Sequence, residues 1–338
     1  MKKLSIINKI IYFINSILAF FLLASYLLPF ISPEQFPILA VLSLFVPFLI
    51  FVNIIFAIYW LLSIKKHLLL SSIILLIGWL TLPPIYKFFD KKTISENSIS
   101  IMSYNVRLFN LWEWKKDKKI PEKINKFIQE KSPDILLFQD YHTLVNQDFK
   151  YKYHYIKTKA KKNKIGLAIF SKFPIINSGS LDLKNTSNNI IFVDVLRGND
   201  TIRVYNIHLQ SLKLKTDKEN FGQENSEKLV TTLEDGFIKQ VSQTIVFLDH
   251  EKNWKRKKII AGDFNNTSFS WVYTQISKGK KDAFIEAGKG FGKTYDYQFP
   301  MRIDYILTDK VAEIQKFSSF NQKNSDHFPI LASINWLE

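Results

Sequence analysis

The stretch Ala261-Gly262-Asp263-Phe264-Asn265-Asn266 follows two apolar residues, Ile259 and Ile260, which together with Ala261 are typical of a buried strand. Gly262 marks the point where this strand is expected to end and the backbone can turn tightly. A carboxylate and an amide two positions apart, at the end of a rigid strand, are candidates for a polar site at the edge of a sheet. Asp and Asn also form plain turns by bonding their own backbone, so the stretch alone leaves both interpretations open.

Similar polar residues end other predicted strands of the same half of the chain. Apolar runs predict strands over about residues 99–106, 135–138, 166–170, 190–195, 202–209, 259–261, 301–307 and 329–336, with helices over 121–131, 229–248 and from about 268. Asn105, Asp140, His208, Asp263, Asn265 and Asp304 lie at or beside strand ends, and Asp326 and His327 directly precede the last strand. Loops at strand ends are where scaffolds place function, so this repetition indicates a site.

The first 86 residues are far more apolar than the rest. They predict three transmembrane helices, over about residues 10–31, 37–62 and 68–86, because each run is close to the roughly 20 residues that cross a hydrocarbon core of about 30 Å. We therefore expect a transmembrane region over residues 1–88, a polar linker over 89–97 and a separate domain over 98–338.

The short loops between the apolar runs predict the orientation, because Lys and Arg are retained on the cytoplasmic side. Lys2, Lys3 and Lys9 precede the first run, only Glu34 follows it, and Lys65 and Lys66 follow the second, whereas Lys87, Lys91 and Lys92 argue for the reverse. We expect an integral protein of the bacterial inner membrane with its polar domain outside the cytoplasm. A cleaved signal peptide is the alternative for the first run, but the run is too long and lacks a clear cleavage site.

The composition excludes thiol chemistry and disulfides, because the chain has no Cys. A zinc site would have to use His and carboxylates. The formal charge of +16 is compatible with binding to nucleic acid or anionic lipid. Much of it lies in Lys-rich stretches at 115–119, 157–164 and 255–258, and we favour solvated loops for these.

Six short motifs occur in order along residues 98–338. They are Ser103-Tyr104-Asn105-Val106, Pro133-Asp134-Ile135 with Phe138-Gln139-Asp140, Asn206-Ile207-His208-Leu209, Gly262-Asp263-Phe264-Asn265, Arg302-Ile303-Asp304-Tyr305 and Ser325-Asp326-His327-Phe328-Pro329. In this order they resemble the endonuclease/exonuclease/phosphatase superfamily, which includes deoxyribonuclease I, abasic-site endonucleases, sphingomyelinases and inositol polyphosphate phosphatases. The resemblance implies a four-layer α/β sandwich, in which two packed mixed β-sheets are flanked by helices and the site lies at one rim.

The resemblance also implies a role for each matching residue. Asp263 would orient or deprotonate the attacking water, and Asn265 would donate hydrogen bonds to the phosphoryl group. Asp304 would fix the imidazole of His327, whose other nitrogen binds or protonates a phosphate oxygen, and His208 would act on the opposite side of the phosphate. A buried strand histidine bonded to backbone is the alternative for His208.

The implied cofactor is Mg²⁺ or Mn²⁺, held by the oxygen atoms of Asn105, Asp140 and Asp326, since such hard ligands favour these ions over zinc. The family usually has Glu where this chain has Asp140. The shorter side chain withdraws the carboxylate by roughly 1.5 Å, which affects metal binding more than the fold. No acidic partner for His208 is evident near residues 164–166, where some nucleases supply one.

These observations predict a membrane-anchored, divalent-metal-dependent phosphoesterase that hydrolyses phosphodiester bonds by metal-assisted attack of water. Nucleic acid is the first expected substrate, a phospholipid or sphingomyelin-type head group the second, and a phosphate monoester of the inositol-phosphate kind the third. The lipid bilayer is the other expected partner, and no protein partner is expected. A catalytically weak binding module on the same fold is the alternative that Asp140 favours. Loops at 108–119 and 211–226 are expected to select the substrate.

Overall fold

The computed structural model describes residues 4–91, 94–145, 149–159, 164–212 and 226–336. The helices are α1 (Ile6–Ser25), α2 (Pro37–Leu62), α3 (Leu68–Thr81), α4 (Ile120–Lys131), α5 (Ser226–Glu251), α6 (Trp271–Ser277) and α7 (Ala283–Ala287), with short 3₁₀ turns η1 (Leu28–Phe30) and η2 (Arg107–Asn110). The strands are β1 (Ile99–Asn105), β2 (Ile135–His142), β3 (Tyr153–Thr158), β4 (Ile165–Ser171), β5 (Ile175–Ser180), β6 (Asn189–Arg197), β7 (Asp200–His208), β8 (Lys258–Asp263), β9 (Lys280–Asp282), β10 (Asp304–Asp309), β11 (Ala312–Ser319) and β12 (Ile330–Trp336). Most of the predicted 211–226 loop lies outside the described residues.

The strands form two six-stranded sheets, in the orders β11-β12-β1-β2-β4-β3 and β5-β6-β7-β8-β10-β9. Both sheets are mixed: β1 pairs with β2, and β7 with β8, in parallel, while their other neighbours are antiparallel. Apolar side chains from the two sheets pack together between them, as Ile101 and Leu137 of one sheet meet Val204 and Ile259 of the other.

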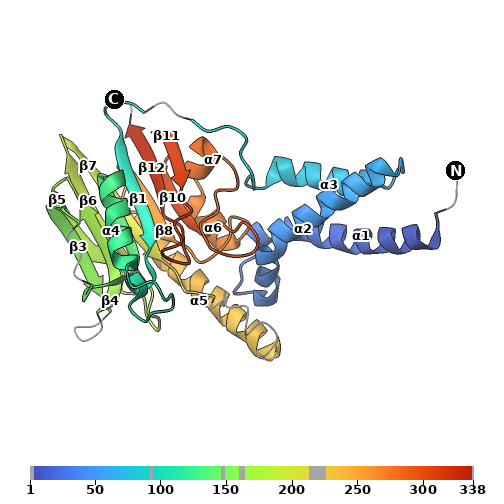
Figure 1. Ribbon diagram of the computed structural model, residues 1–338, viewed down its shortest axis with the longest axis horizontal. Helices are drawn as coiled ribbons and strands as arrows, with labels where there is room; N and C mark the ends of the chain where they lie inside the picture. Colours follow the sequence, from blue (N-terminus) through green and yellow to red (C-terminus); the bar gives the residue numbers. More distant parts are fainter. Residues whose placement is uncertain (1–3, 92–93, 146–148, 160–163, 213–225, 337–338) are drawn as a thin grey trace.

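Helices cover the outer face of each sheet (Figure 1). Helix α4 packs its apolar stripe, Ile120, Ile124 and Phe127, on the sheet that contains β1. Helices α5 and α6 cover the other sheet through residues such as Phe247 and Ile276. The strands are apolar on both faces because both are buried, and the result is the predicted four-layer α/β sandwich.

The strand register gathers the predicted site residues at one rim. His208 of β7 pairs with Asp263 of β8, and Asp263 pairs with Asp304 of β10. In the other sheet, Asn105 of β1 pairs with Gln139 of β2. Because parallel strands end at the same edge of a sheet, side chains far apart in the sequence lie together there.

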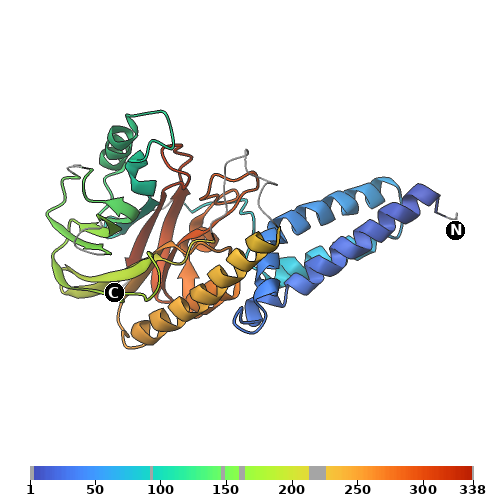
Figure 2. The same cartoon turned by 90° about the horizontal axis from the view of Figure 1, so that it is seen from below.

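Helices α1, α2 and α3 form an arm that extends from one end of the sandwich, with the N-terminus at its far tip (Figures 1 and 2). By length and composition, two segments of the described chain can cross a membrane: Ile6–Phe30 and Pro37–Leu62. The prediction of three spans is corrected for the third, because α3 ends at Thr81 after 14 residues, about 21 Å. Pro83 disfavours helical geometry at Leu82 and explains this early end.

The arm buries a chain of polar side chains beside an apolar cluster and is apolar on its outer surface. Asn15 Nδ2 donates to Ser71 Oγ at 2.7 Å, Ser71 donates to Asn53 Oδ1 at 3.0 Å, and Trp60 Nε1 donates to Asn15 Oδ1 at 3.0 Å. Large apolar side chains of the arm, Phe51 among them, are exposed on the outside. This distribution is the reverse of a water-soluble helix bundle.

Several strand predictions need correction. The strands β3, β5, β9 and β11 are missing from the prediction, because they are partly exposed or carry polar residues that weaken an apolar pattern. The strand predicted from Met301 begins at Asp304, since the preceding residues leave the ladder and Arg302 turns inward to pair with Asp282 at 2.6 Å. Gly262 lies inside β8 rather than after it.

Candidate active site

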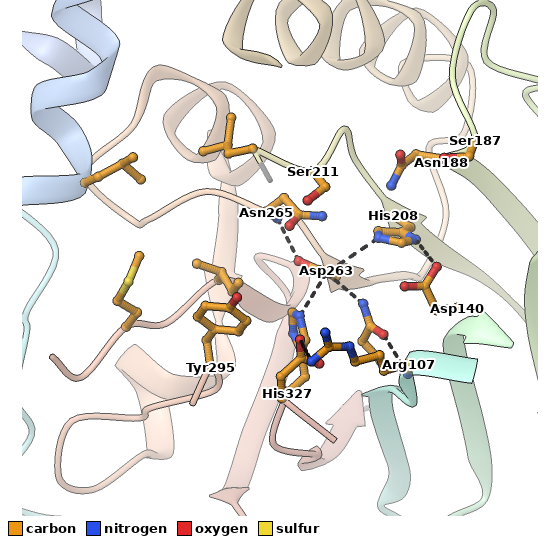
Figure 3. Close-up of a pocket in the computed structure, with 16 residues that line it drawn as sticks. Arg107, Asp140, Ser187, Asn188, His208, Ser211, Asp263, Asn265, Tyr295 and His327 are labelled. Carbon is orange, nitrogen blue, oxygen red and sulfur yellow. Dashed lines mark hydrogen bonds and ion pairs between the residues drawn. The ribbon is translucent and has the colours of Figure 1, made fainter. Parts of the chain in front are cut away.

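The predicted site residues meet in a pocket of about 280 Å³ at the rim of the two sheets. Its lining includes Asn105, Asp140, His208, Asp263, Asn265, Asp326 and His327. Asp304 does not line the pocket but lies behind His327. Figure 3 shows His208, Asn265 and His327 directed toward Asp263 and joined to it by dashed lines.

Asp263 is the centre of this group and is fully buried. Its Oδ2 accepts a hydrogen bond from Asn105 Nδ2 at 3.0 Å and lies 3.6 Å from Nε2 of both His208 and His327. Its Oδ1 accepts the backbone N–H of Asn265 at 2.8 Å. These contacts fix the carboxylate between two imidazoles, as a base that orients water requires.

Gly262 is required by a close approach of two strands. Its φ is +139°, and a Cβ atom at this position would lie 1.9 Å from the carbonyl oxygen of Ile207 in β7. Only glycine fits, because any side chain would push β8 away from β7. Asp263 therefore stands directly beside His208.

Asp304 and His327 form a buried pair, as the sequence predicts. His327 Nδ1 lies 3.0 Å from Asp304 Oδ2. Burial raises the pKa of Asp304 to about 6, although the neighbouring His327 charge opposes this shift. Burial alone would lower the pKa of His327, but the charges of Asp304 and Asp263 raise it to about 10. At neutral pH the pair is therefore an imidazolium and a carboxylate.

His208 has an acidic partner that the sequence analysis did not identify. Its Nδ1 lies 3.7 Å from Oδ1 of Asp140. Asp140 has a φ of +47° and lies where the β2–β4 register shifts. Asp adopts this left-handed conformation more readily than Glu, so the backbone explains the residue that departs from the family pattern.

The pocket also offers the oxygen atoms expected of a divalent cation site. Asn105, Asp140 and Asp326 all line it, and an amide with two carboxylates suits a hard cation. Asp326 is 2.9 Å from Nη1 of Arg107, which fixes its side chain. Asp263, Asp304 and His327 form a second group that could hold a metal ion. Their potential ligand atoms all lie within 4.8 Å of one another.

The amide of Asn265 is held at the pocket by the neighbouring loop. Its φ is +50°, and its Nδ2 donates to the carbonyl oxygen of Leu209 at 3.0 Å. The amide nitrogen has a second N–H, which suits the predicted contact with a phosphoryl oxygen.

Gln139 and Asn206 brace the two sheets beneath the pocket. Gln139 Nε2 donates to Asn206 Oδ1 at 2.7 Å, and Asn206 Nδ2 donates to the carbonyl oxygens of Phe138 and Ala168 at 2.9 and 3.0 Å. Both side chains are fully buried, so these hydrogen bonds fix the distance between the two sheets. The motif residue Asn206 thus positions the site without lining it.

Pocket residues that the sequence analysis did not name include Ser187, Asn188 and the three that follow. Arg107 pairs with Asp326 and lies 4.2 Å above the ring of Trp114. Tyr295 places its ring 5.0 Å from that of His327, and burial raises the pKa of its hydroxyl. Leu44 comes from α2. Arg107 could have been found from the sequence, because it lies two positions after the motif residue Asn105. Leu44 could not, because an apolar helix carries no signal that one of its residues lines a pocket.

Comparisons with known proteins agree with this geometry. The model of the Endonuclease/Exonuclease/phosphatase family matches residues 102–327. A second model, described as a domain of unknown function (DUF8431), matches residues 8–87. No curated protein matches the chain.

Several solved structures share the fold. An endonuclease/exonuclease/phosphatase family protein from Bacteroides thetaiotaomicron is 16% identical with a TM-score of 0.54, over 73% of this chain and 100% of that one. The human Nocturnin catalytic domain with bound sulfate anion is 16% identical with a TM-score of 0.54, over 72% and 97%. A mannosyl-6-phosphatase from Bacteroides thetaiotaomicron is 17% identical with a TM-score of 0.53, over 71% and 100%. Because the family model spans more than half of the chain, this protein belongs to the Endonuclease/Exonuclease/phosphatase family of hydrolases that act on phosphate esters.

Proposed function

We propose that the protein is a membrane-anchored, divalent-metal-dependent phosphoesterase that hydrolyses phosphodiester bonds with water. The observation that carries this proposal is the position of Asp263 between two imidazoles, each backed by a further carboxylate: His327 by Asp304 at 3.0 Å and His208 by Asp140 at 3.7 Å. Such an arrangement can take a proton from the attacking water and present imidazole donors to the phosphoryl oxygens.

Each side chain has a defined part in the reaction. Water attacks phosphorus while Asp263 accepts its proton, and the phosphorus–oxygen bond to the leaving alcohol breaks. His327, protonated at neutral pH and 3.6 Å from Asp263, binds or protonates a phosphoryl oxygen, and the leaving oxygen takes its proton from solvent. Asn265 and His208 donate hydrogen bonds to the phosphoryl oxygens, which carry more charge in the transition state. The products are an alcohol and a phosphate monoester.

Mg²⁺ or Mn²⁺ fits the oxygen set of Asn105, Asp140 and Asp326, and when bound it would neutralise charge on the phosphoryl oxygens. We assign Asp304 and His327 to proton transfer instead, since the imidazole Nδ1 is already engaged by Asp304. Arg107, beside Asp326, is placed to contact a phosphate oxygen as well.

Membrane anchoring by the helical arm is supported by its side-chain distribution. Only 28% of the most apolar window of α1 and of α2 is buried, unlike the core helices of soluble proteins. The bonds that join Asn15, Ser71 and Asn53 tie α1 to the other two helices, which favours a retained helix over a cleaved signal sequence. We infer from Lys65 and Lys66 that the catalytic domain lies outside the cytoplasm of a bacterial inner membrane, with α3 and the residues after Thr81 returning the chain to that side, whereas Lys87, Lys91 and Lys92 argue for the reverse.

Nucleic acid is a candidate substrate because of a basic groove beside the pocket. This groove of about 730 Å³ shares Asp140 and His208 with the pocket and is lined by Lys157, Lys159 and Lys239. Lys157 is paired with Asp182 at 2.9 Å, which reduces the net positive charge offered to a polyanion.

The proposed activity is tested with the full-length protein in detergent and bis-p-nitrophenyl phosphate as substrate. We expect hydrolysis that stops with a chelator and returns with Mg²⁺ or Mn²⁺. His327→Ala should lower kcat by roughly 10²–10⁴-fold, whereas His154→Ala, an exposed histidine on β3, should not change it. No hydrolysis by folded wild-type protein with either ion would contradict the proposal.

A further inference from the structure

A residue of the helical arm forms part of the wall of the catalytic pocket. Leu44 of α2 lines the pocket together with Asp263 and His327. It packs against the domain residues Met301 and Ile303. Helix α2 therefore contributes to the wall of the pocket.

Buried contacts join the arm and the domain next to Leu44. Thr267 Oγ1, just after the Asp263 stretch, donates to the carbonyl oxygen of Ser43 at 3.0 Å in a buried position. Phe269 of the domain lies within the apolar core of the arm, and Phe299 meets Phe48 edge to face at 5.5 Å. These contacts, with those of Leu44 to Met301 and Ile303, dock α2 on the domain beside the pocket.

The length of α2 sets the height of the pocket above the bilayer. Leu62 ends the helix, and Lys65 and Lys66 follow it as expected at one membrane boundary. From Leu62 to Leu44 the helix rises about 27 Å, close to the hydrocarbon thickness of about 30 Å. Leu44 therefore reaches the opposite boundary, where lipid phosphates lie.

The pocket itself is amphipathic. Charged and amide groups around Asp263 form one part of its lining, and Leu44, Leu212, Met301 and Ile303 form another. Figure 3 shows the blue helix of the arm approaching the pocket on the side away from His208 and Asp140. A ligand that places a phosphate at Asp263 would place its neighbouring group on this apolar wall.

We propose that the substrate is a phosphate ester of a membrane lipid, whose phosphate enters the pocket at head-group level while the lipid part beside it packs on Leu44, Met301 and Ile303. The inference rests on the proposed phosphoesterase activity and on anchoring by the arm. A free phosphodiester would satisfy Asp263 and the histidines but would leave the apolar wall without a partner.

The first test uses full-length protein in nanodiscs of phosphatidylcholine that contain phosphatidylglycerol, phosphatidylethanolamine, sphingomyelin or phosphatidic acid, with Mg²⁺ or Mn²⁺. Deacylated glycerophosphodiesters, single-stranded DNA and RNA oligonucleotides and bis-p-nitrophenyl phosphate are tested in parallel. We expect kcat/KM for at least one nanodisc lipid to exceed that for its deacylated or otherwise water-soluble counterpart by at least about tenfold.

The outcomes separate this inference from the proposed function. Hydrolysis of bis-p-nitrophenyl phosphate or of an oligonucleotide, with no lipid cleaved, would overturn the lipid inference and leave the phosphoesterase activity standing. Equal rates on a lipid and its deacylated counterpart would overturn it too. Hydrolysis of no phosphate ester by folded protein would count against both.

A variant in the apolar wall tests the contact directly. Leu44→Gln should lower the ratio of kcat/KM for the lipid to that for bis-p-nitrophenyl phosphate by about tenfold, and Leu44→Met should restore the ratio. Phe51→Gln is the matched control, because Phe51 lies on α2 but is exposed and outside the pocket. A ratio that falls equally in Leu44→Gln and Phe51→Gln, or in neither, would contradict the assigned contact.

The height of the pocket is measured independently of activity. The chain has no Cys, so Phe45→Cys and Phe51→Cys each provide a single site for a nitroxide label. Both side chains are exposed on α2. We expect the label at Phe45 to lie at the head-group boundary, about 9 Å shallower than the label at Phe51. Equal depths, or a label at Phe45 in the middle of the bilayer, would overturn the placement.

Discussion

Nδ1 of His327 lies 3.0 Å from Oδ2 of Asp304, and both side chains are buried. Their pairing fixes the imidazole tautomer and orientation, and it leaves Nε2 directed toward Asp263 at 3.6 Å. The Asp304 carboxylate does not line the pocket, so in the proposed mechanism it acts on the substrate only through His327.

Replacing Asp304 by Asn tests this positioning role. Asp304→Asn keeps the shape of the side chain but removes the charge that holds the imidazolium, so we expect kcat to fall by roughly 10²–10⁴-fold with a smaller change in KM. Asp249→Asn, on the exposed surface of α5, is the matched control. An unchanged kcat in a folded Asp304→Asn protein would show that the function of His327 does not depend on the Asp304 carboxylate.

The same pair predicts the acid limb of the pH profile. The pKa of Asp304 is raised to about 6, so its carboxyl takes up a proton as the pH falls through that value. Protonation removes the charge that orients His327, and we expect kcat to fall below about pH 6 and to be nearly constant from there toward neutral pH. The measurement is kcat against pH with bis-p-nitrophenyl phosphate. Full activity retained at pH 4 would contradict this assignment.

Asp140→Glu tests the departure from the family pattern. The longer side chain reaches about 1.5 Å further, so we expect half-maximal activity at a lower Mg²⁺ concentration. The φ of +47° disfavours Glu, and the free energy of unfolding should fall by less than about 1 kcal/mol. Asp182→Glu, at a φ of +48° outside the pocket, reports the backbone cost together with any change in the Asp182–Lys157 pair. An unchanged Mg²⁺ dependence would remove Asp140 from the metal ligands.

Gly262→Ala tests the close approach of β7 and β8. The new Cβ would meet the Ile207 carbonyl at 1.9 Å, so we expect the melting temperature to fall and activity to be lost together. Gly198→Ala is a matched control, because Gly198 has a φ of +58° but nothing within 4 Å of its Cβ position. Backbone strain alone should cost that variant roughly 1 kcal/mol. Equal stability losses in the two variants would contradict the importance of the clash.

The centre of the site was predictable from the sequence because its residues stand at strand ends within ordered motifs. Asp263, His208 and Asp304 occupy one row of the strand register, which is how three distant motifs become one site. The contact between Asp304 and His327 is confirmed by their distance. The family resemblance supplied the two packed sheets, which periodicity alone does not specify.

The rest of the site depends on packing that has no local sequence signal. Asp140 faces His208 only because a register shift and a left-handed φ turn it there. Leu44 belongs to an apolar helix whose pattern predicts lipid contact, and only the docking of the arm brings it to the pocket. Short edge strands such as β9 were missed because two or three paired residues carry no periodicity.

The most direct test of the central claim is the effect of Asp263→Asn on kcat for bis-p-nitrophenyl phosphate, measured with the full-length protein and saturating Mg²⁺ or Mn²⁺. The substitution keeps the shape of the side chain but removes the base between the two imidazoles. We predict a loss of at least about 10²-fold in kcat with an unchanged fold. Wild-type kcat in a folded Asp263→Asn protein would contradict the account.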